Sequence, residues 1–294
     1  MSPTERGALL ALLRLPQQSW SAAADKVESA GSALEVLQQR SVGQLTLFTE
    51  DVDSEPLAQA AEAEIAEWER EGMRFLTILD PDYPAQLLAV HQRPPFLMIK
   101  GSLGAADSRS VAIVGTRQAS DQGLQQAEEL ARGLARAGVP VVSGLAAGID
   151  TAALRGVLGA DGRAVAVIGT GLRRTYPKEN AGLQERIARK GLVISQFLPD
   201  APPTKSSFPM RNAVMSGYSA ATVVVEAPYR SGARAQARLA LEHGRQVFLL
   251  EAVMVNGWAQ RYAQKPNTTV VRTVDDVLGH LKSALITGQD LVWA

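Results

Sequence analysis

The chain has 294 residues, 46% of them hydrophobic, and carries 30 basic and 30 acidic side chains, which predicts a soluble globular protein with one large core. The absence of cysteine excludes disulfides, thiolate metal ligands and cysteine nucleophiles, and the three histidines are too scattered for a histidine-rich metal site, so we expect neither metal nor cofactor. No apolar run reaches the length of a membrane span and the N-terminus lacks a signal-peptide pattern, so we expect a cytoplasmic protein without membrane association.

The first 72 residues predict a small helical domain. Apolar residues recur at helical spacing from Glu5 to about Gln39, and an Ala/Glu-rich helix follows from Glu55 to Glu71. The segment 41–56 between them has no clear period and is predicted to be a loop or hinge.

Charge is distributed unevenly along the chain. Residues 1–70 hold 5 Lys/Arg against 12 Asp/Glu, a net charge of −7, so residues 71–294 hold 25 against 18, a net charge of +7. A basic body is compatible with a polyanionic ligand, and ordinary surface variation explains it almost as well.

The main body is predicted to span residues 73–285, with 286–294 as a tail. After two short strands near "MRFLTILD" and "PPFLMIKG", apolar strands alternate with helices from Arg109 onward. Strands that are apolar on both faces and joined by helical crossovers specify a parallel sheet covered on both sides. The sequence therefore predicts an α/β fold, an extended Rossmann-like, doubly wound and mostly parallel sheet.

The loop after the first strand of this alternation is a candidate phosphate site. In open parallel sheets, ligands bind beyond the carboxyl ends of the strands. Here Gly115 ends the strand, and Thr116, Arg117 and Ser120 follow before a helix. The planar guanidinium of Arg117 and the backbone N–H groups of the turn suit a phosphate, and a salt bridge to a neighbouring loop is an equal alternative for Arg117.

The stretch "SGLAAGID" repeats this design after the second strand. Ser143, Gly144 and Gly148 bare the backbone, which allows close approach of a ligand. Asp150 lies in the first turn of the next helix and could cap it. Because its carboxylate would repel a phosphate, we expect it to orient Arg117 or a loop amide instead.

The segment "PPTKSSFPMRN" gathers a cation, an aromatic ring and polar groups. Pro209 suits the first position of a helix, which would place Arg211 and Asn212 in the first turn, where the helix dipole favours an anion. Lys205 and Phe208 precede that start. Single-strand binders combine cations with aromatic stacking in this way, although a lone Phe208 could also staple the helix.

Known catalytic patterns do not match. "GTGLRR" lacks the last glycine of the dinucleotide fingerprint, and no P-loop is present. There is no nucleophile elbow, no histidine beside a candidate serine and no paired carboxylate, so we do not expect an enzyme.

Five motifs in order and spacing resemble the DprA/Smf DNA-processing family: "VAIVGTRQAS", "SGLAAGIDTAA", "AVIGTGLRRTYPKEN", "FPMRN" and "VVVEAPYRSGARAQARLALEHGRQVF". The resemblance covers roughly Phe75 to Leu249. It implies a non-enzymatic protein that binds single-stranded DNA, presents it to a RecA-type recombinase in recombination or natural transformation, and forms a homodimer.

The resemblance also implies roles for single residues. Arg117 would grip phosphate, and Lys205 and Phe208 would be the lysine and the aromatic residue of the DNA-binding loop, followed by the helix start. Arg211 and Asn212 would form this helix start. The pocket floor would consist of Gly115, Ser143, Gly144 and Gly148.

The chain departs from the family pattern at Ala213, at Gln236 and Ala237, and at Leu250 and Glu251. A diverged member could serve a different purpose. The second hypothesis is therefore a nucleotide-sensing or partner-regulating protein that uses the same pocket, for example the antitoxin half of a phage-defence pair with a toxin as its partner.

Overall fold

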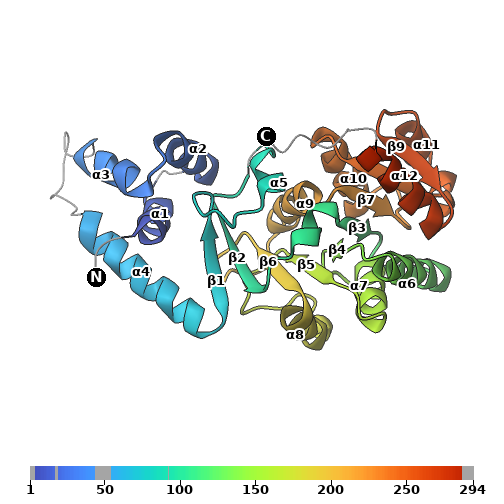
Figure 1. Cartoon of the computed structure of the whole chain (residues 1–294), viewed down its shortest axis with the longest axis horizontal. Coiled ribbons are helices and arrows are strands. Elements are labelled where there is room, and N and C mark those ends of the chain that lie inside the picture. The colour runs from blue at the N-terminus through green and yellow to red at the C-terminus, as the bar shows by residue number, and fades with distance from the viewer. Residues whose placement is uncertain (1–3, 17–18, 44–53, 92, 287–294) are drawn as a thin grey trace. The chain divides into compact units, whose positions relative to one another are not determined.

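The computed structural model describes residues 4–16, 19–43, 54–91 and 93–286. Its elements are labelled along the chain in Figure 1. Packing divides the chain into two units: Met1–Pro84 with Gln92–Ile99, and Ala85–His91 with Lys100–Ala294.

The first unit contains the predicted helical region, and the periodic stretch from residue 5 onward forms separate helices. Ser19 begins a new helix because its hydroxyl accepts a hydrogen bond from Ala22 N, at 3.2 Å. Residues 44–53 of the predicted loop 41–56 lie outside the described part of the chain. The helices are α1 (Glu5–Arg14), α2 (Trp20–Ala30), α3 (Ala33–Gly43) and α4 (Ser54–Arg70).

Strands β1 (Met73–Thr77) and β2 (Phe96–Gly101) follow the helices. The Phe75 ring lies 6.0 Å from Trp68 of α4 and 4.9 Å from Phe96, measured between ring centroids. Through these buried aromatic contacts β1 belongs to the helical unit. The sequence analysis places the end of the helical domain at residue 72, before β1. Division into an N-terminal domain and a core stays a prediction.

The second unit holds seven parallel strands in the order β6-β5-β4-β3-β7-β8-β9. All residues of β3, β5, β6 and β7 are buried, as the apolar runs predict for strands covered on both faces. The strands are β3 (Val111–Val114), β4 (Val141–Ser143), β5 (Ala164–Ile168), β6 (Leu192–Ser195), β7 (Ala221–Val224), β8 (Gln246–Leu250) and β9 (Thr268–Val271).

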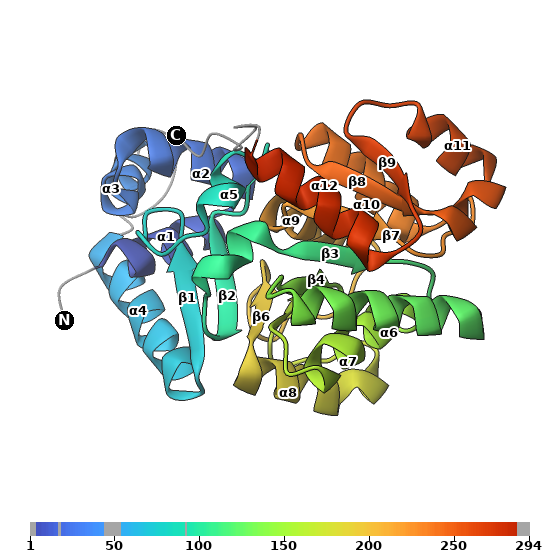
Figure 2. The ribbon, with the colours of Figure 1, turned by 45° about the vertical axis from the view of Figure 1, so that its right-hand side comes forward.

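Helices cover both faces of this sheet. Helix α6 packs against α7 and α12, and α9 packs against α10, and Figure 2 shows these two groups on opposite faces. The predicted doubly wound, mostly parallel Rossmann-like fold is thus confirmed. The helices of this unit are α5 (Ala85–Leu88), α6 (Asp121–Arg136), α7 (Ile149–Gly159), α8 (Ala181–Lys190), α9 (Ser207–Tyr218), α10 (Gly232–Glu242), α11 (Gly257–Ala263) and α12 (Val274–Ile286). Residues 287–294 of the predicted tail lie outside the described residues.

A buried polar cluster anchors the C-terminal end of α9. The Tyr218 hydroxyl donates to Asp107 Oδ2 at 2.7 Å, and Arg163 Nη2 donates to the same oxygen at 2.6 Å. Burial, followed by the charge of Asp107, raises the pKa of Tyr218, which therefore stays a protonated donor. Because α9 also carries Phe208 and Arg211 at its other end, this cluster fixes the helix that supports the site.

Candidate nucleic-acid interface

A surface cluster, here called the rim, is formed by the exposed Arg117 and Tyr176 and the half-buried Phe208. Arg117 follows β3, Tyr176 lies in the loop before α8, and Phe208 is the second residue of α9. The Arg117 Cζ atom lies 5.0 Å from the Phe208 ring centroid and 5.9 Å from that of Tyr176, and the two rings are 5.5 Å apart. A guanidinium at this distance is attracted to the ring faces. The rim therefore presents one cation and two aromatic surfaces together.

Tyr176 is the rim residue that the sequence analysis missed. Its side chain is 45% exposed, which is unusual for an aromatic residue packed among neighbours. The signal was available in "LRRTYPKEN", because an aromatic residue after a strand end lies where ligand-binding loops converge.

Beneath the rim, a second group called the floor consists of Gly144, Asp150 and Arg211. Arg211 is only 5% exposed, and its Nη1 donates to Val167 O at 3.1 Å. A Cβ atom on Gly144 would overlap Nη1 of Arg211, so the glycine leaves room for that guanidinium. The backbone bared at Gly144 is thus covered by an arginine of the protein.

Asp150 holds the floor together and does not pair with Arg117. Its Oδ2 accepts from Gly144 N at 3.1 Å and from Ala146 N at 3.4 Å, and lies 4.0 Å from Nη1 of Arg211. The expectation that Asp150 orients a loop amide agrees with these contacts. Its arginine partner is Arg211 instead, because the fold buries these two charges side by side.

Burial dominates the electrostatics of the floor. It raises the pKa of Asp150 above the ordinary value of 3.8, and Arg211 and the two amides oppose the rise. It lowers the pKa of Arg211, and Asp150 opposes that fall. Since a guanidinium does not lose its proton in proteins, Arg211 brings a permanent positive charge to the floor.

A small cavity of about 70 Å³ lies between the rim and the floor. Its walls include Arg117, Phe208 and Tyr176 above, and Gly144 and Arg211 below. Two cations, aromatic edges and loop backbone face this space. Such a lining suits a phosphate group with an unpaired base beside it.

Helix α9 starts earlier than predicted. Thr204 Oγ1 accepts from Ser207 N at 3.0 Å, and Ser207 Oγ accepts from Thr204 N at 3.1 Å, so the helix begins at Ser207. Pro209 is tolerated at the third position because N–H groups of the first turn have no intrahelical partner. The prediction that Arg211 and Asn212 occupy the first turn was therefore wrong, and both lie deeper and are buried.

Two of the predicted pocket glycines serve packing. A Cβ atom on Gly115 would clash with Ile149, and one on Gly148 would clash with Thr116 O. Gly148 also has a φ of +78°, which favours glycine. These glycines let the loop after β3 pack closely against the start of α7.

Three predicted hydroxyls are used within the protein. Ser143 is fully buried and donates to Ile113 O at 2.7 Å. Thr116 Oγ1 accepts from Gln118 N at 3.2 Å. Ser120 caps α6 by accepting from Gly123 N at 3.0 Å. The three hydroxyls therefore make hydrogen bonds within a strand, a turn and a helix cap of the protein itself.

Glu226 already provides the negative charge at the start of α6. Its carboxylate accepts from Ser120 N at 3.1 Å and from Ser120 Oγ at 2.8 Å. This carboxylate stabilises the helix N-terminus and would repel a phosphate there. A phosphate at Arg117 would therefore be disfavoured beside the start of α6.

The other two predicted residues lie on either side of the α9 start. Lys205 is exposed just before the helix. Asn212 is 8% exposed, and its Nδ2 donates to Gly232 O at 3.5 Å.

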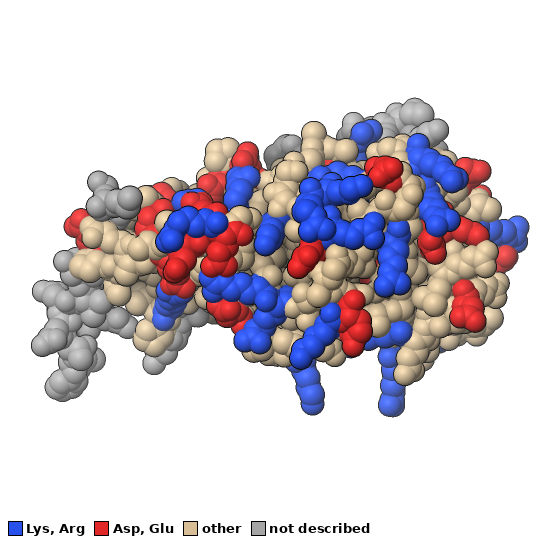
Figure 3. All heavy atoms as spheres, turned by 90° about the horizontal axis from the view of Figure 1, so that it is seen from below, with Lys and Arg blue, Asp and Glu red and all other residues tan. Residues whose placement is uncertain are grey.

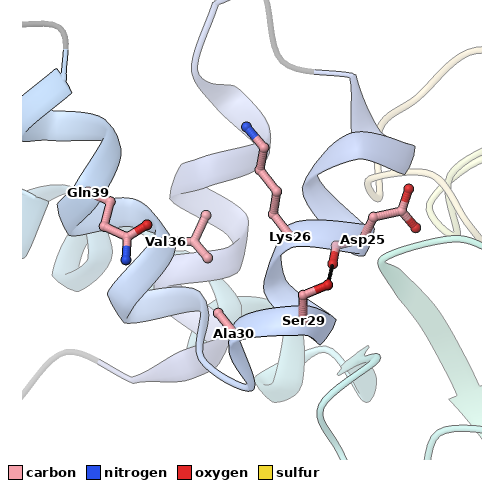
Figure 4. A pocket seen from close by; sticks show the side chains of 6 residues that line it. All are labelled: Asp25, Lys26, Ser29, Ala30, Val36 and Gln39. Atoms are coloured by element: carbon pink, nitrogen blue, oxygen red, sulfur yellow. Dashed lines mark hydrogen bonds between the residues drawn. The ribbon is translucent and has the colours of Figure 1, made fainter.

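A separate groove of about 590 Å³ lies in the helical unit between α2 and α3 (Figure 4). Lys26 and Asp25 stand at its edge, and Ala30 and Val36 line its interior. One positive and one negative side chain offset each other here. This groove therefore lacks the cationic character of the rim and floor.

Charged side chains cover much of the face shown in Figure 3, where Lys and Arg are interspersed with Asp and Glu. On α10, Arg238 pairs with Glu242 at 2.7 Å, and the Arg234 guanidinium lies 4.4 Å from the Tyr229 ring centroid. No helix among the described residues has the length and hydropathy to cross a bilayer. Within the same ranges, no group of three or more metal-ligating side chains occurs.

Comparison with known proteins places the chain in a family. The family model described as DNA recombination-mediator protein A matches residues 74–282. DNA processing protein DprA of Streptococcus pneumoniae is 41% identical over 181 residues, which are 62% of this chain and 64% of the relative. Protein Smf of Synechocystis is 40% identical over 190 residues, 63% of this chain and 48% of the relative. The matches thus span about half to two thirds of these relatives.

Two solved structures are also similar. The X-ray structure of DprA from Streptococcus pneumoniae aligns with a TM-score of 0.74 and 29% identity, covering 95% of this chain and 98% of that one. DNA processing protein A of Helicobacter pylori, described for its single-stranded DNA binding mode, aligns with a TM-score of 0.63 and 26% identity, covering 71% and 96%. The chain belongs to the DNA recombination-mediator protein A family, the DprA/Smf family that its motifs predicted.

Proposed function

We propose that this protein binds single-stranded DNA at the rim and floor. The observation that carries the proposal is the Arg117 guanidinium packed against both the Phe208 and the Tyr176 rings, which also contact each other, at the mouth of the small cavity. Phosphate binds a guanidinium through paired hydrogen bonds, and unpaired bases stack on aromatic rings. The single-stranded DNA binding mode described for the Helicobacter pylori relative supports the same function here.

In this proposal the rim, Lys205 and the floor divide the contacts with DNA between them. Arg117 contacts phosphate directly, and the exposed Lys205 contacts a neighbouring phosphate. Phe208 and Tyr176 stack bases. Gly144 and Asp150 act indirectly, because they hold Arg211 at the base of the cavity.

We further propose that the protein acts as a homodimer in recombination or natural transformation and hands DNA to a RecA-type recombinase. The description of the family as a recombination mediator supports this role over the nucleotide-sensing hypothesis. It acts by binding and without catalysis. In support, the small cavity is lined in the described chain by cations, aromatic rings, backbone and Thr170, without a histidine or carboxylate.

Fluorescence anisotropy with a labelled 20-nucleotide oligo(dT), dT20, tests the DNA-binding function. We expect dT20 to bind more tightly than a duplex of the same length, because paired bases cannot stack on the rim. The logarithm of the affinity should fall with the logarithm of salt concentration by about 0.7 per phosphate contact. Duplex binding as strong as dT20 binding, or a response independent of salt, would reject the proposal.

A further inference from the structure

A larger cavity adjoins the site at the point where the strand order of the sheet reverses. Strands β4, β5 and β6 extend from β3 in one direction, and β7, β8 and β9 extend in the other. Ligands of doubly wound sheets bind in the crevice beyond the strand ends at this reversal. Here the loops after β3 and β7 enclose about 470 Å³, called the switch-point cavity below. This volume lies in the range of small-molecule sites, about 300–1,000 Å³.

Arg211, which lines this cavity, carries an unsatisfied donor. Nε of the buried Arg211 has no hydrogen-bond partner within the described part of the chain, and Arg211 lines both this cavity and the smaller one. An uncompensated buried donor of this kind is costly, so it points to a ligand. Arg117 and Arg230 also line the cavity and add positive charge, while Asp150 supplies one negative charge at the floor. The charges favour an anion on the arginine side.

The opposite wall suits a planar, partly polar group. Pro228 is exposed and offers an apolar surface, while Met215, which also lines the cavity, is only 1% exposed. The Gln236 amide bridges Asn212 O, at 3.0 Å, and Ser216 N, at 3.1 Å, and so fixes α9 to α10. The Asn212 side-chain amide stands beside this wall, and such amides recognise base edges through paired donor and acceptor atoms.

We propose that the switch-point cavity holds one unstacked nucleotide, with its phosphate against Arg211 and its base against Pro228 and Asn212. The proposal rests on the DNA-binding function above and assigns a second subsite to it. The nucleotide is a residue of the bound strand, and a free nucleoside monophosphate has the same chemistry. The rim then holds the strand while the cavity holds one base that has left the stack.

A side chain added at Gly232 tests this proposal. Gly232 is the first residue of α10, lines the cavity, and an added Cβ meets no heavy atom within 4 Å. Gly232→Leu should therefore fold normally and obstruct the cavity. Gly182, near the start of α8, is a matched control because its added Cβ also meets nothing within 4 Å. Thermal unfolding confirms that both variants fold.

We expect Gly232→Leu to bind dT20 roughly tenfold more weakly, because the added side chain excludes the base from the cavity. Gly182→Leu should match the unmodified protein. Asn212→Ala, which removes the amide without adding bulk, should weaken binding in the same direction. Equal dT20 affinity for Gly232→Leu and Gly182→Leu would overturn the cavity proposal, and the DNA-binding function would still stand if the unmodified protein prefers dT20 over duplex.

Calorimetric titration with dTMP and with inorganic phosphate shows whether the cavity binds a free nucleotide, a nucleotide of a strand, or only an anion. Binding of dTMP to the unmodified protein but not to Gly232→Leu supports the proposal and shows that a free nucleotide enters. Weaker dT20 binding by Gly232→Leu without dTMP binding supports entry only as part of a strand. If phosphate binds as tightly as dTMP, and equally to both variants, the site is a simple anion site and the proposal is overturned.

Discussion

The rim and the floor each contain an arginine, and the two arginines differ in almost every physical respect. Arg117 is exposed and contacts aromatic rings, while Arg211 is 5% exposed and contacts Val167 O and Asp150. An exposed cation costs little free energy of folding, because it stays hydrated, and it is available for a ligand. A buried one must be compensated by the fold. The comparison suggests that the floor serves stability and binding together, whereas the rim serves binding alone.

The largest expected effect is a difference between the two arginines in how much each contributes to the free energy of unfolding. We expect Arg211→Ala to lower the free energy of unfolding by about 3–5 kcal/mol, because it leaves Asp150 as an unpaired buried carboxylate. Arg117→Ala should change it by no more than about 0.5 kcal/mol. Urea denaturation at neutral pH measures both. Similar small losses in the two variants would show that the floor pair is not structural.

The next effect concerns the rim and DNA affinity. Arg117→Ala should weaken dT20 binding by about 1.5–3 kcal/mol, the range for hydrogen bonds to charged groups. Arg117→Lys should recover only part of the loss, since an ammonium cannot make the paired contact. Arg132→Ala on α6 is a matched control, because Arg132 is an exposed arginine paired with Glu128. Anisotropy that finds Arg117→Ala and Arg132→Ala equally mild would refute the rim assignment.

A double-mutant cycle tests the contact between Gly144 and Arg211 in the floor. Gly144→Ala should cost about 1–3 kcal/mol of unfolding free energy, since the added methyl overlaps the Arg211 guanidinium, which must leave its place beside Asp150. In the Arg211→Ala background the same change should cost much less. Gly182→Ala should cost nothing, because its Cβ meets open space. An equal cost of Gly144→Ala in both backgrounds contradicts the direct contact.

The smallest effect is a pH dependence of the floor. Burial raises the pKa of Asp150 above 3.8, and Arg211 opposes that rise, so Arg211→Ala should raise the pKa further. Between pH 3.8 and the raised pKa the folded state then binds more protons than the unfolded state, and stability falls as pH rises. The loss caused by Arg211→Ala should therefore grow with pH by at most about 1.4 kcal/mol per unit. If the loss of unfolding free energy in Arg211→Ala is constant from pH 4 upward, the pKa of Asp150 does not depend on Arg211.

The motif spacing predicted which loops meet, and the structure explains why the residue roles differed. Gly115 and Gly148 were assigned to the pocket floor because glycine permits close approach, and the approaching group is another part of the chain. Ser120 was assigned to a phosphate because it starts a helix, and Glu226 from a distant strand already occupies that position. A sequence pattern shows that a backbone is accessible, but it does not show what covers it.

The sequence by itself determined the α/β class and the positions of the strand ends, since apolar strands and helical crossovers are set by local periodicity. It also predicted that Arg117 and Phe208 lie in loops that meet at one edge of the sheet, because Arg117 follows a strand end and Phe208 lies close to a helix start. The tertiary structure decided that Arg211 covers Gly144, that Asp150 pairs with Arg211, and that Tyr176 completes the rim. These contacts join segments far apart in the chain, and their geometry depends on how α7 and α9 pack across the sheet, which no local pattern encodes.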